Sequence, residues 1–326
     1  MCYSAQIRAD YRRYVREWQA RISLREFVEL FWWKWEDGGT QGRGAKPKIP
    51  KAMELAFVDP QTDDERLIKR YIDEANAREA LALQAELFKQ RKRLADAERA
   101  LQGRPTKKAA EDQRIAGDKV RRILGWLADL GRTEALERDA RIFPLHYAPV
   151  MVWEDGQRVI KPMRYGCRPA GVPAFYDTRF PGTYNARRDN LQGFWRKQFG
   201  HTHAVMVANA FYENVPRHKV EGRELAPGEA PENQVLEFRP RPTQEMLVAC
   251  LWSRWSAPGE RELLSFAAIT DEPPPEVAAA GHDRCIIPIK PEHLDEWLNP
   301  QASTPQRLQA ILDDRERPYY EHRLAA

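Results

Sequence analysis

The chain has 326 residues, of which 42% are hydrophobic and 10% aromatic, enough for a sizeable core in one large or two ordinary domains. No apolar run reaches the length of a membrane span, and the N-terminal residues lack the apolar stretch of a secretory signal. We therefore expect a cytoplasmic protein that does not enter membranes. Its net charge of +4 is uneven, because residues 141–220 carry +7 and residues 221–326 carry −8. A basic segment is often only a solvated surface, but it is also what a phosphate-binding cleft requires.

Conventional signatures of metal and cofactor sites are missing. The four cysteines lie far apart without a CxxC pair, which argues against a disulfide framework or a zinc site. The chain also has no HExxH motif and no dinucleotide fingerprint. We expect no metal and no cofactor. The His201–His203 pair, which has no acidic or cysteine ligand nearby, is interpreted as a surface or structural feature.

The chain opens with MCYS, which puts a cysteine directly after the initiator methionine. If Met1 is removed, Cys2 presents an α-amine and a thiol on adjacent carbons, a pair that condenses with aldehydes. The alternative interpretation is a small, buried apolar residue. Two helices are expected next: one over residues 11–18, and one over residues 23–35 that opens with a capping box.

Residues 63–140 differ from the rest of the chain. In residues 61–140, 34 of 80 side chains are charged, and Leu87, Leu94 and Leu101 lie seven residues apart. GRP at residues 103–105 interrupts the pattern before a second helical run over about residues 107–130. We expect a helical hairpin, partly coiled-coil, inserted into a single domain of residues 1–326. It is either a solvated arm or a surface that binds a protein partner.

From residue 141 onward, short apolar runs alternate with proline-rich loops, a pattern typical of β-strands. The runs are HYAPVMVW, HAVMVANAFYE, MLVACLW, LLSFAAIT and RCIIPIK. PEHLDEWLN and PQRLQAILDD then return to a helical pattern. The expected fold class is α+β, built around a curved, barrel-like sheet with flanking helices.

Three residues could join Cys2 in a reactive site. Asn185 stands beside two arginines in the basic segment. Glu213 lies at the end of an apolar strand-like run, where burial would raise the pKa of its carboxyl toward a range useful for acid–base chemistry. His282 stands at the start of another apolar run. Each also has a structural explanation: a turn asparagine, a strand-end ion pair and a capping histidine.

Together, MCYS, NARRDN, HAVMVANAFYEN, SFAAIT and HDRCII occur in an order that resembles the SOS-response-associated peptidase (SRAP) family. Its members resemble thiol autoproteases, and they shield abasic sites in single-stranded DNA by cross-linking to them. The resemblance covers roughly residues 1–10 and 141–290. The chain departs from the family pattern at Ser4, Tyr165, Asp189 and Asn214, two of which replace tryptophans.

The resemblance implies a catalytic set of Cys2, Asn185, Glu213 and His282, with Cys2 forming a thiazolidine on the abasic aldehyde. It implies DNA contacts from Arg187, Arg164, Tyr165 and Thr270. The expected partner is single-stranded DNA with abasic sites, which would place the protein on the nucleoid. Two alternatives stay open: a non-covalent DNA-binding protein of the same fold, and a thiol (auto)peptidase.

Overall fold

The computed structural model describes residues 3–36, 46–103 and 105–325, so Cys2 lies outside the described residues. The chain divides into two compact units. The first comprises Met1–Phe27, Pro47–Ala56 and Leu136–Ala326, and the second comprises Val28–Lys46 and Phe57–Ala135. Among the described residues, none of the helices is both long and apolar enough to cross a membrane.

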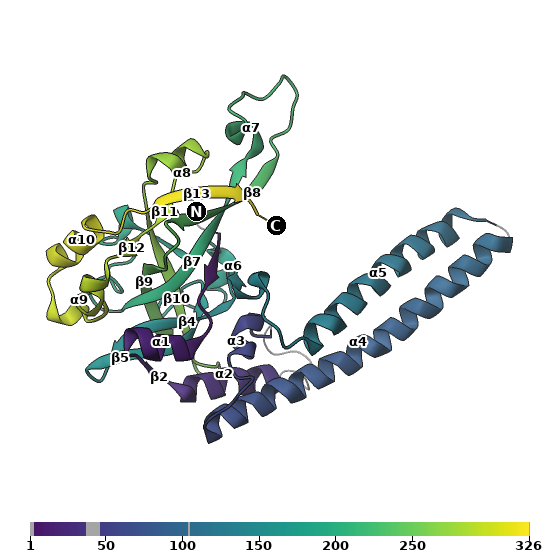
Figure 1. Ribbon diagram of the computed structural model, residues 1–326, viewed down its shortest axis with the longest axis horizontal. Coiled ribbons are helices and arrows are strands. Elements are labelled where there is room, and N and C mark those ends of the chain that lie inside the picture. The colour runs from purple at the N-terminus through teal and green to yellow at the C-terminus, as the bar shows by residue number, and fades with distance from the viewer. Residues whose placement is uncertain (1–2, 37–45, 104, 326) are drawn as a thin grey trace. The chain divides into compact units, whose positions relative to one another are not determined.

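The first unit is built on one large curved sheet (Figure 1). Its longer strands are β4 (Tyr147–Glu154), β5 (Gln157–Tyr165), β7 (His203–Pro216), β8 (Asn233–Arg241), β9 (Met246–Trp255), β10 (Leu263–Asp271) and β13 (Tyr319–Leu324). The shorter strands are β1 (Ser4–Ile7), β2 (Arg21–Ile22), β3 (Arg141–Ile142), β6 (Asn185–Arg187), β11 (Cys285–Ile286) and β12 (Pro288–Ile289).

Several short helices flank this sheet. They are α1 (Tyr11–Trp18), α3 (Lys51–Leu55), α6 (Tyr176–Arg179), α7 (Arg217–Val220), α8 (Pro275–Ala279), α9 (Leu294–Leu298) and α10 (Pro305–Asp313), with 3-10 turns at Glu137–Ala140, Arg188–Asn190, Pro291–His293 and Pro300–Ala302. α2 (Leu24–Glu36) begins in the first unit and ends in the second. The helices expected near residues 11–18 and 23–35 are confirmed, and the Ser23 hydroxyl donates a hydrogen bond to the Glu26 carboxylate.

Five strands of the sheet close into a ring in the order β9-β10-β5-β4-β7, because β7 pairs with both β4 and β9. The first half of β7 closes the ring, with Val205 opposite Met151 of β4 and Ala249 of β9. The second half of β7 pairs with β1 on one side and β8 on the other. A ring buries side chains on its inside, and helices cover part of its outside, so these strands are almost continuously apolar. The expected barrel-like α+β fold is confirmed.

The strand β13 joins the sheet from the far end of the sequence. It pairs along its whole length with β8, from Tyr319 opposite Arg241 to Leu324 opposite Leu236. Tyr320 is buried against Phe211 of β7, and its backbone N–H donates to the Glu276 carboxylate of α8 at 3.1 Å. β5, β8 and β13 were not among the strands expected from the sequence, because polar residues interrupt their apolar patterns.

One buried cation ties α2 to the barrel. The Lys161 side chain of β5 is almost fully buried, and its ammonium donates to Glu26 of α2 at 2.9 Å and to Glu154 of β4 at 2.6 Å. Burial opposes ionisation of Glu26, but hydrogen bonds from Ser23 and Lys161 outweigh it and lower the pKa of that carboxyl. A buried charge costs free energy unless it is paired, so this cluster depends on all its members.

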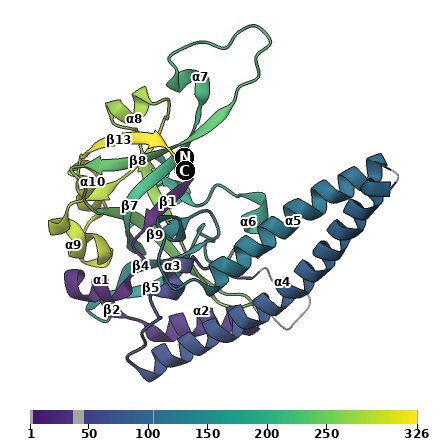
Figure 2. The same cartoon turned by 45° about the vertical axis from the view of Figure 1, so that its right-hand side comes forward.

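The second unit contains a helical hairpin, α4 (Asp63–Gly103) and α5 (Lys107–Gly131), whose helices lie side by side and antiparallel (Figures 1 and 2). Leu87, Ala97, Ala109, Ala116 and Ile123 are buried along its seam. The hairpin expected from the sequence is confirmed, with the break at GRP where it was predicted. The compact unit is wider than residues 63–140, because it includes the end of α2, where Trp35 packs on Tyr71 and its Nε1 donates to Glu74.

We predict that Lys161→Ala lowers the free energy of unfolding by about 3 kcal/mol, because two carboxylates lose their shared buried cation. Urea unfolding monitored by circular dichroism would measure the change. The matched control is Lys290→Ala, which removes a lysine that pairs with Asp314 at the surface and should cost less than about 1 kcal/mol. Equal losses in the two variants would contradict a special role for the buried cation.

Candidate functional site

A buried carboxylate and an imidazole meet at the second half of β7. Glu213 lies opposite Leu236 of β8 and has an exposed fraction of 0%. The turn between α8 and β11 carries His282, whose Nε2 lies 3.1 Å from Oε2 of Glu213. The apolar run that predicts β7 therefore also buries the Glu213 carboxylate. Its partner, His282, lies about seventy positions further along the chain.

The backbone holds the His282 ring on its other side. Its Nδ1 lies 2.8 Å from the carbonyl oxygen of Arg284, and the preceding Gly281 has a φ of +92°, which a side chain would strain. Burial lowers the pKa of His282 below its ordinary value, so the imidazole is neutral at neutral pH. A neutral imidazole between a carboxylate and a carbonyl can relay a proton to or from Glu213. Burial first, and the Glu213 charge second, raise the pKa of the nearby Cys285 thiol, which is therefore unreactive.

His282 is reached through an open groove of about 470 Å³ between its own turn and the β7–β8 connection. A methyl group added at Gly281 would lie only 3.0 Å from Cβ of Lys219, so the two segments are in close contact. Lys219 is exposed and forms no ion pair with any other described residue.

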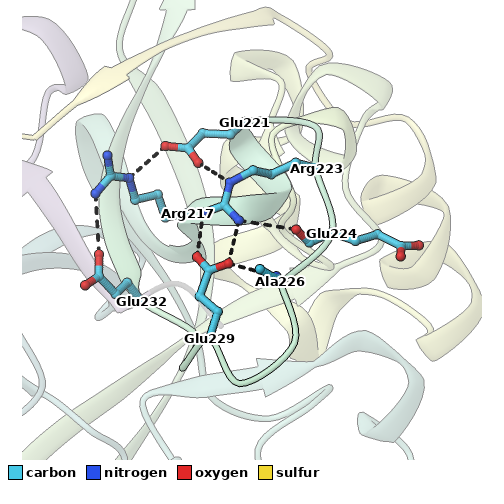
Figure 3. A network of polar contacts seen from close by, with 7 residues as sticks. All are labelled: Arg217, Glu221, Arg223, Glu224, Ala226, Glu229 and Glu232. Carbon is cyan, nitrogen blue, oxygen red and sulfur yellow. Dashed lines mark hydrogen bonds and ion pairs between the residues drawn. The ribbon is translucent and has the colours of Figure 1, made fainter.

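The rest of the connection between β7 and β8 is held by its own ion pairs, drawn in Figure 3. Arg223 binds Glu221 and Glu229, while Arg217 binds Glu221 and Glu232. The Arg223 pair and the Ala226 N–H lower the pKa of Glu229 to about 2. The guanidinium groups of this connection are therefore neutralised locally.

Asn185 lies on β6, which runs parallel to the end of β10. Asn185 is opposite Ala268, and Arg187 is opposite Thr270. On its other edge Thr270 pairs with Ile286 of β11, shortly after His282. The side chain of Asn185 is buried and accepts a hydrogen bond of 3.4 Å from the Tyr165 hydroxyl. The end of β10 thus brings the Asn185 strand and the His282 turn to its two edges.

Thr270 and Arg187, which lie opposite each other at the end of β10, differ in the exposure of their side chains. Thr270 is fully buried, and no described residue forms a hydrogen bond with its hydroxyl. Arg187 is half exposed and pairs with Asp189 at the surface. Asp189 first, and Asp283 beside His282 in addition, raise the pKa of Arg187. The strand register places Arg187 and Ile286, which follows the His282 turn, on opposite edges of β10 at Thr270.

The structure does not support the DNA contacts expected of Tyr165 and Arg164. Tyr165 has an exposed fraction of 0% and stacks on Phe266 of the barrel, so no ring face is open to a base. Arg164 is largely buried, and its guanidinium binds Asp177 at 2.8 Å and the carbonyl of Gly166 at 3.1 Å. Both residues lie on the β5 segment that pairs with β10.

Exposed aromatic residues appear instead in the segment that leads to Asn185. Phe175 and Phe180 have exposed fractions of 61% and 44%. The ring of Tyr176 lies 4.6 Å from that of Phe180, and the Arg179 guanidinium lies over Phe180. This cluster was not predicted from the sequence. The signal was AFYDTRF, with three aromatic residues and one arginine in seven positions, but exposure cannot be read from composition.

The first residue that the structure describes also lies beside this region. Tyr3 makes an edge-to-face contact with Tyr184, which directly precedes Asn185, at a ring distance of 6.5 Å. A second contact of the same kind, at 5.8 Å, joins Tyr3 to Phe143. β1 thus brings the chain next to β6, although the two are about 180 residues apart in sequence.

The histidine pair HTH does not form a ligand site. His203 is buried against Trp297, and its Nε2 accepts from the Gly200 N–H while its Nδ1 lies 3.1 Å from the Trp297 carbonyl. These contacts suit a neutral ring with its proton on Nδ1. Across residues 3–36, 46–103 and 105–325, no group of three or more histidine, cysteine, aspartate or glutamate side chains could hold a metal ion.

Comparison with known proteins gives a family match. A family model described as SOS response associated peptidase (SRAP) matches residues 103–324. The match confirms the resemblance inferred from the motifs, although it does not include MCYS. None of the curated proteins compared with the chain matches it.

Three solved structures to which the chain is similar are of bacterial proteins. A protein from Bacteroides thetaiotaomicron is 14% identical with a TM-score of 0.46, covering 57% of this chain and 78% of its own. A protein from Bordetella bronchiseptica is 18% identical with a TM-score of 0.45, covering 57% and 87%. A phage-related protein from Bordetella bronchiseptica is 20% identical with a TM-score of 0.42, covering 60% and 85%.

We predict that the protein loses stability as the pH falls from 6.5 to about 5. Burial lowers the pKa of His146 to about 4, that of His203 to about 3, and that of His282 below its ordinary 6.5. In this pH range the histidines bind protons in the unfolded chain but not in the folded protein. Their contribution to the free energy of unfolding is therefore fully present above pH 6.5 and declines below it. For buried His203 the slope approaches about 1.4 kcal/mol per pH unit, with smaller contributions from the other two.

Urea unfolding at a series of pH values would measure this slope. His203→Gln, whose amide can serve both backbone partners, should flatten it. A free energy of unfolding that stays constant between these pH values would contradict the prediction.

Proposed function

Because the chain belongs to the SOS response associated peptidase family, which is linked to the SOS response and abasic-site handling, we propose that it captures abasic sites in single-stranded DNA as a covalent cross-link through Cys2. The observation that carries the proposal is the buried Glu213–His282 pair at 3.1 Å. A buried carboxylate with an imidazole partner is an acid–base device, and few purely structural roles need one at a sheet end beside an open groove.

The chemistry requires that Met1 be removed. The free α-amine of Cys2 then attacks C1′ of the ring-opened abasic sugar and gives a carbinolamine. Loss of one water yields a Schiff base, after which the thiol sulfur adds to the imine carbon and its proton passes to nitrogen. The product is a thiazolidine, and one water is released in all. An α-amine with a pKa near about 8 is neutral often enough at neutral pH to attack.

In this proposal Glu213 protonates the leaving hydroxyl of the carbinolamine, a step for which general acid catalysis contributes about 10²–10⁴-fold. His282 passes protons to and from Glu213 and assists opening of the sugar ring. Asn185, held by Tyr165, orients the amine or the sugar by hydrogen bonds. Positioning amine, thiol and aldehyde together replaces a bimolecular encounter with an intramolecular one.

DNA would approach over the segment that leads into β6. Arg187 offers an exposed guanidinium for a phosphate. Thr270, opposite Arg187 on β10, is fully buried and would line the site rather than contact a phosphate. Phe175 and Phe180 take over the stacking role first assigned to Tyr165, because exposed aromatic rings stack on bases regardless of sequence. Binding to DNA in this way would place the protein on the nucleoid.

We predict that the protein, with Met1 removed, forms a denaturation-resistant complex with a single-stranded oligonucleotide that carries one abasic site. Cys2→Ala should abolish this complex, because the imine it still forms hydrolyses, but cyanoborohydride should trap that imine. Glu213→Gln should slow cross-linking about 10²-fold or more, since the amide keeps the shape and loses the acid. Denaturing gels measure the yield, and intact mass reports Met1.

Cys167→Ala is the matched thiol control and should cross-link as fast as the wild type, because Cys167 is buried and burial raises the pKa of its thiol to about 12. A wild-type protein that has lost Met1, binds the oligonucleotide and gives no complex would reduce the function to non-covalent binding. Release of Met1 by the purified protein itself, prevented by Glu213→Gln, would add an autopeptidase activity.

We also predict that Phe175→Ala and Phe180→Ala weaken binding to single-stranded DNA by about 1–3 kcal/mol each, the usual value of one base stack. Fluorescence anisotropy with a tetrahydrofuran abasic analogue, which has no aldehyde, measures binding without chemistry. Tyr319→Ala removes a comparably exposed ring from β13 and serves as the control. The stacking role is contradicted if Phe175→Ala and Phe180→Ala bind the DNA as tightly as Tyr319→Ala does.

A further inference from the structure

Charge is divided along the helical hairpin of the second unit. Residues 63–87 of α4 include seven acidic and four basic residues. Residues 88–115, which include the tip, contain nine basic and four acidic residues. The net charge of residues 61–140 is only +2, so the separation is hidden in the total. A field of one sign at one end of a helix pair attracts ligands of the opposite sign.

Ion pairs neutralise three described arginines of the tip but none of its described lysines. Arg93 binds Asp112 across the two helices, Arg99 binds Asp96, and Arg114 binds Glu111. These pairs occupy three of the four tip carboxylates. The described tip cations that form no ion pair with another described residue are Lys89, Arg91, Lys92, Lys107 and Lys108.

Three of these lysines surround one feature. A shallow groove of about 550 Å³ runs between α4 and α5 and is lined by Lys89 and Lys92 from one helix and Lys108 from the other. Its apolar lining consists of alanines such as Ala97 and Ala109, whose small side chains leave the groove open. The two aspartates at the groove, Asp96 and Asp112, are those already bound by arginines, so the three ammonium groups determine its charge.

We propose that this groove at the hairpin tip binds the phosphate backbone of nucleic acid, independently of base sequence and of the abasic-site chemistry. Protein interfaces are enriched in aromatic residues and arginine and depleted of lysine, and no aromatic residue lines the groove. Lysine is instead a common point-charge ligand of phosphate. The groove therefore fits a polyanion of closely spaced phosphates better than a protein surface.

The test measures the salt dependence of binding to a lesion-free DNA duplex, which offers no abasic site and no unstacked bases. Each phosphate neutralised on B-DNA contributes about 0.9 to the slope of log K against log salt concentration. The triple variant Lys89→Gln, Lys92→Gln and Lys108→Gln should therefore reduce the magnitude of the slope by about 2 to 3, while circular dichroism shows an unchanged helix content.

The matched control changes the charge equally at arginines of the hairpin that are ion-paired: Arg66→Gln, Arg70→Gln and Arg121→Gln. It should leave the slope within about 1 of the wild type. Equal slopes in the wild type and the lysine variant would overturn the proposal. A lysine variant that loses binding to an acidic polyglutamate peptide but still binds DNA would also overturn it. Because the duplex carries no abasic site, this result is independent of whether Cys2 forms a cross-link.

Discussion

The first unit depends on one strand that changes its neighbours halfway. The first half of β7 closes a five-stranded ring by pairing with β4 and β9, and its second half leaves the ring to run between β1 and β8. Glu213 lies in this second half, opposite Leu236 of β8 and one residue beyond the last pair with β1, and its side chain is fully buried. The half of β7 that leaves the ring thus carries a buried carboxylate, with Nε2 of His282 at 3.1 Å from its Oε2. A buried charge costs free energy unless it is paired, so the imidazole matters to this end of the strand.

The sequence predicts the elements of this arrangement better than its contacts. HAVMVANAFYE indicates a strand because its apolar run is long, and MLVACLW and LLSFAAIT do the same for β9 and β10. β5 is not predicted from the sequence, because a lysine such as Lys161 is normally a surface residue and interrupts the apolar pattern. Its burial depends on Glu26 and Glu154, which no local pattern links to it.

Which side chains of the candidate site are exposed could not be predicted from the sequence. Tyr165 and Arg164 carry the chemistry suited to DNA, but the ring of Tyr165 stacks on Phe266 and the guanidinium of Arg164 binds Asp177. Phe175 and Phe180 follow Tyr165 by 10 and 15 positions and are exposed. Residue type and order in the chain therefore identified the region, whereas exposure required the strand register. The family match supports the same region, since it covers residues 103–324.

The pairing of β13 with β8 has a consequence for how the protein is made. Tyr320 packs on Phe211 two residues before Glu213, and it binds Glu276 of the helix that precedes His282. β1 meanwhile pairs with the same part of β7 from the start of the sequence. The surroundings of the pair thus need segments more than 300 residues apart. During synthesis, β1 and β7 can pair as soon as both have left the ribosome, but the contacts of Tyr320 with Phe211 and Glu276 can form only after residues 319–324 have been made. This part of the fold is therefore completed last.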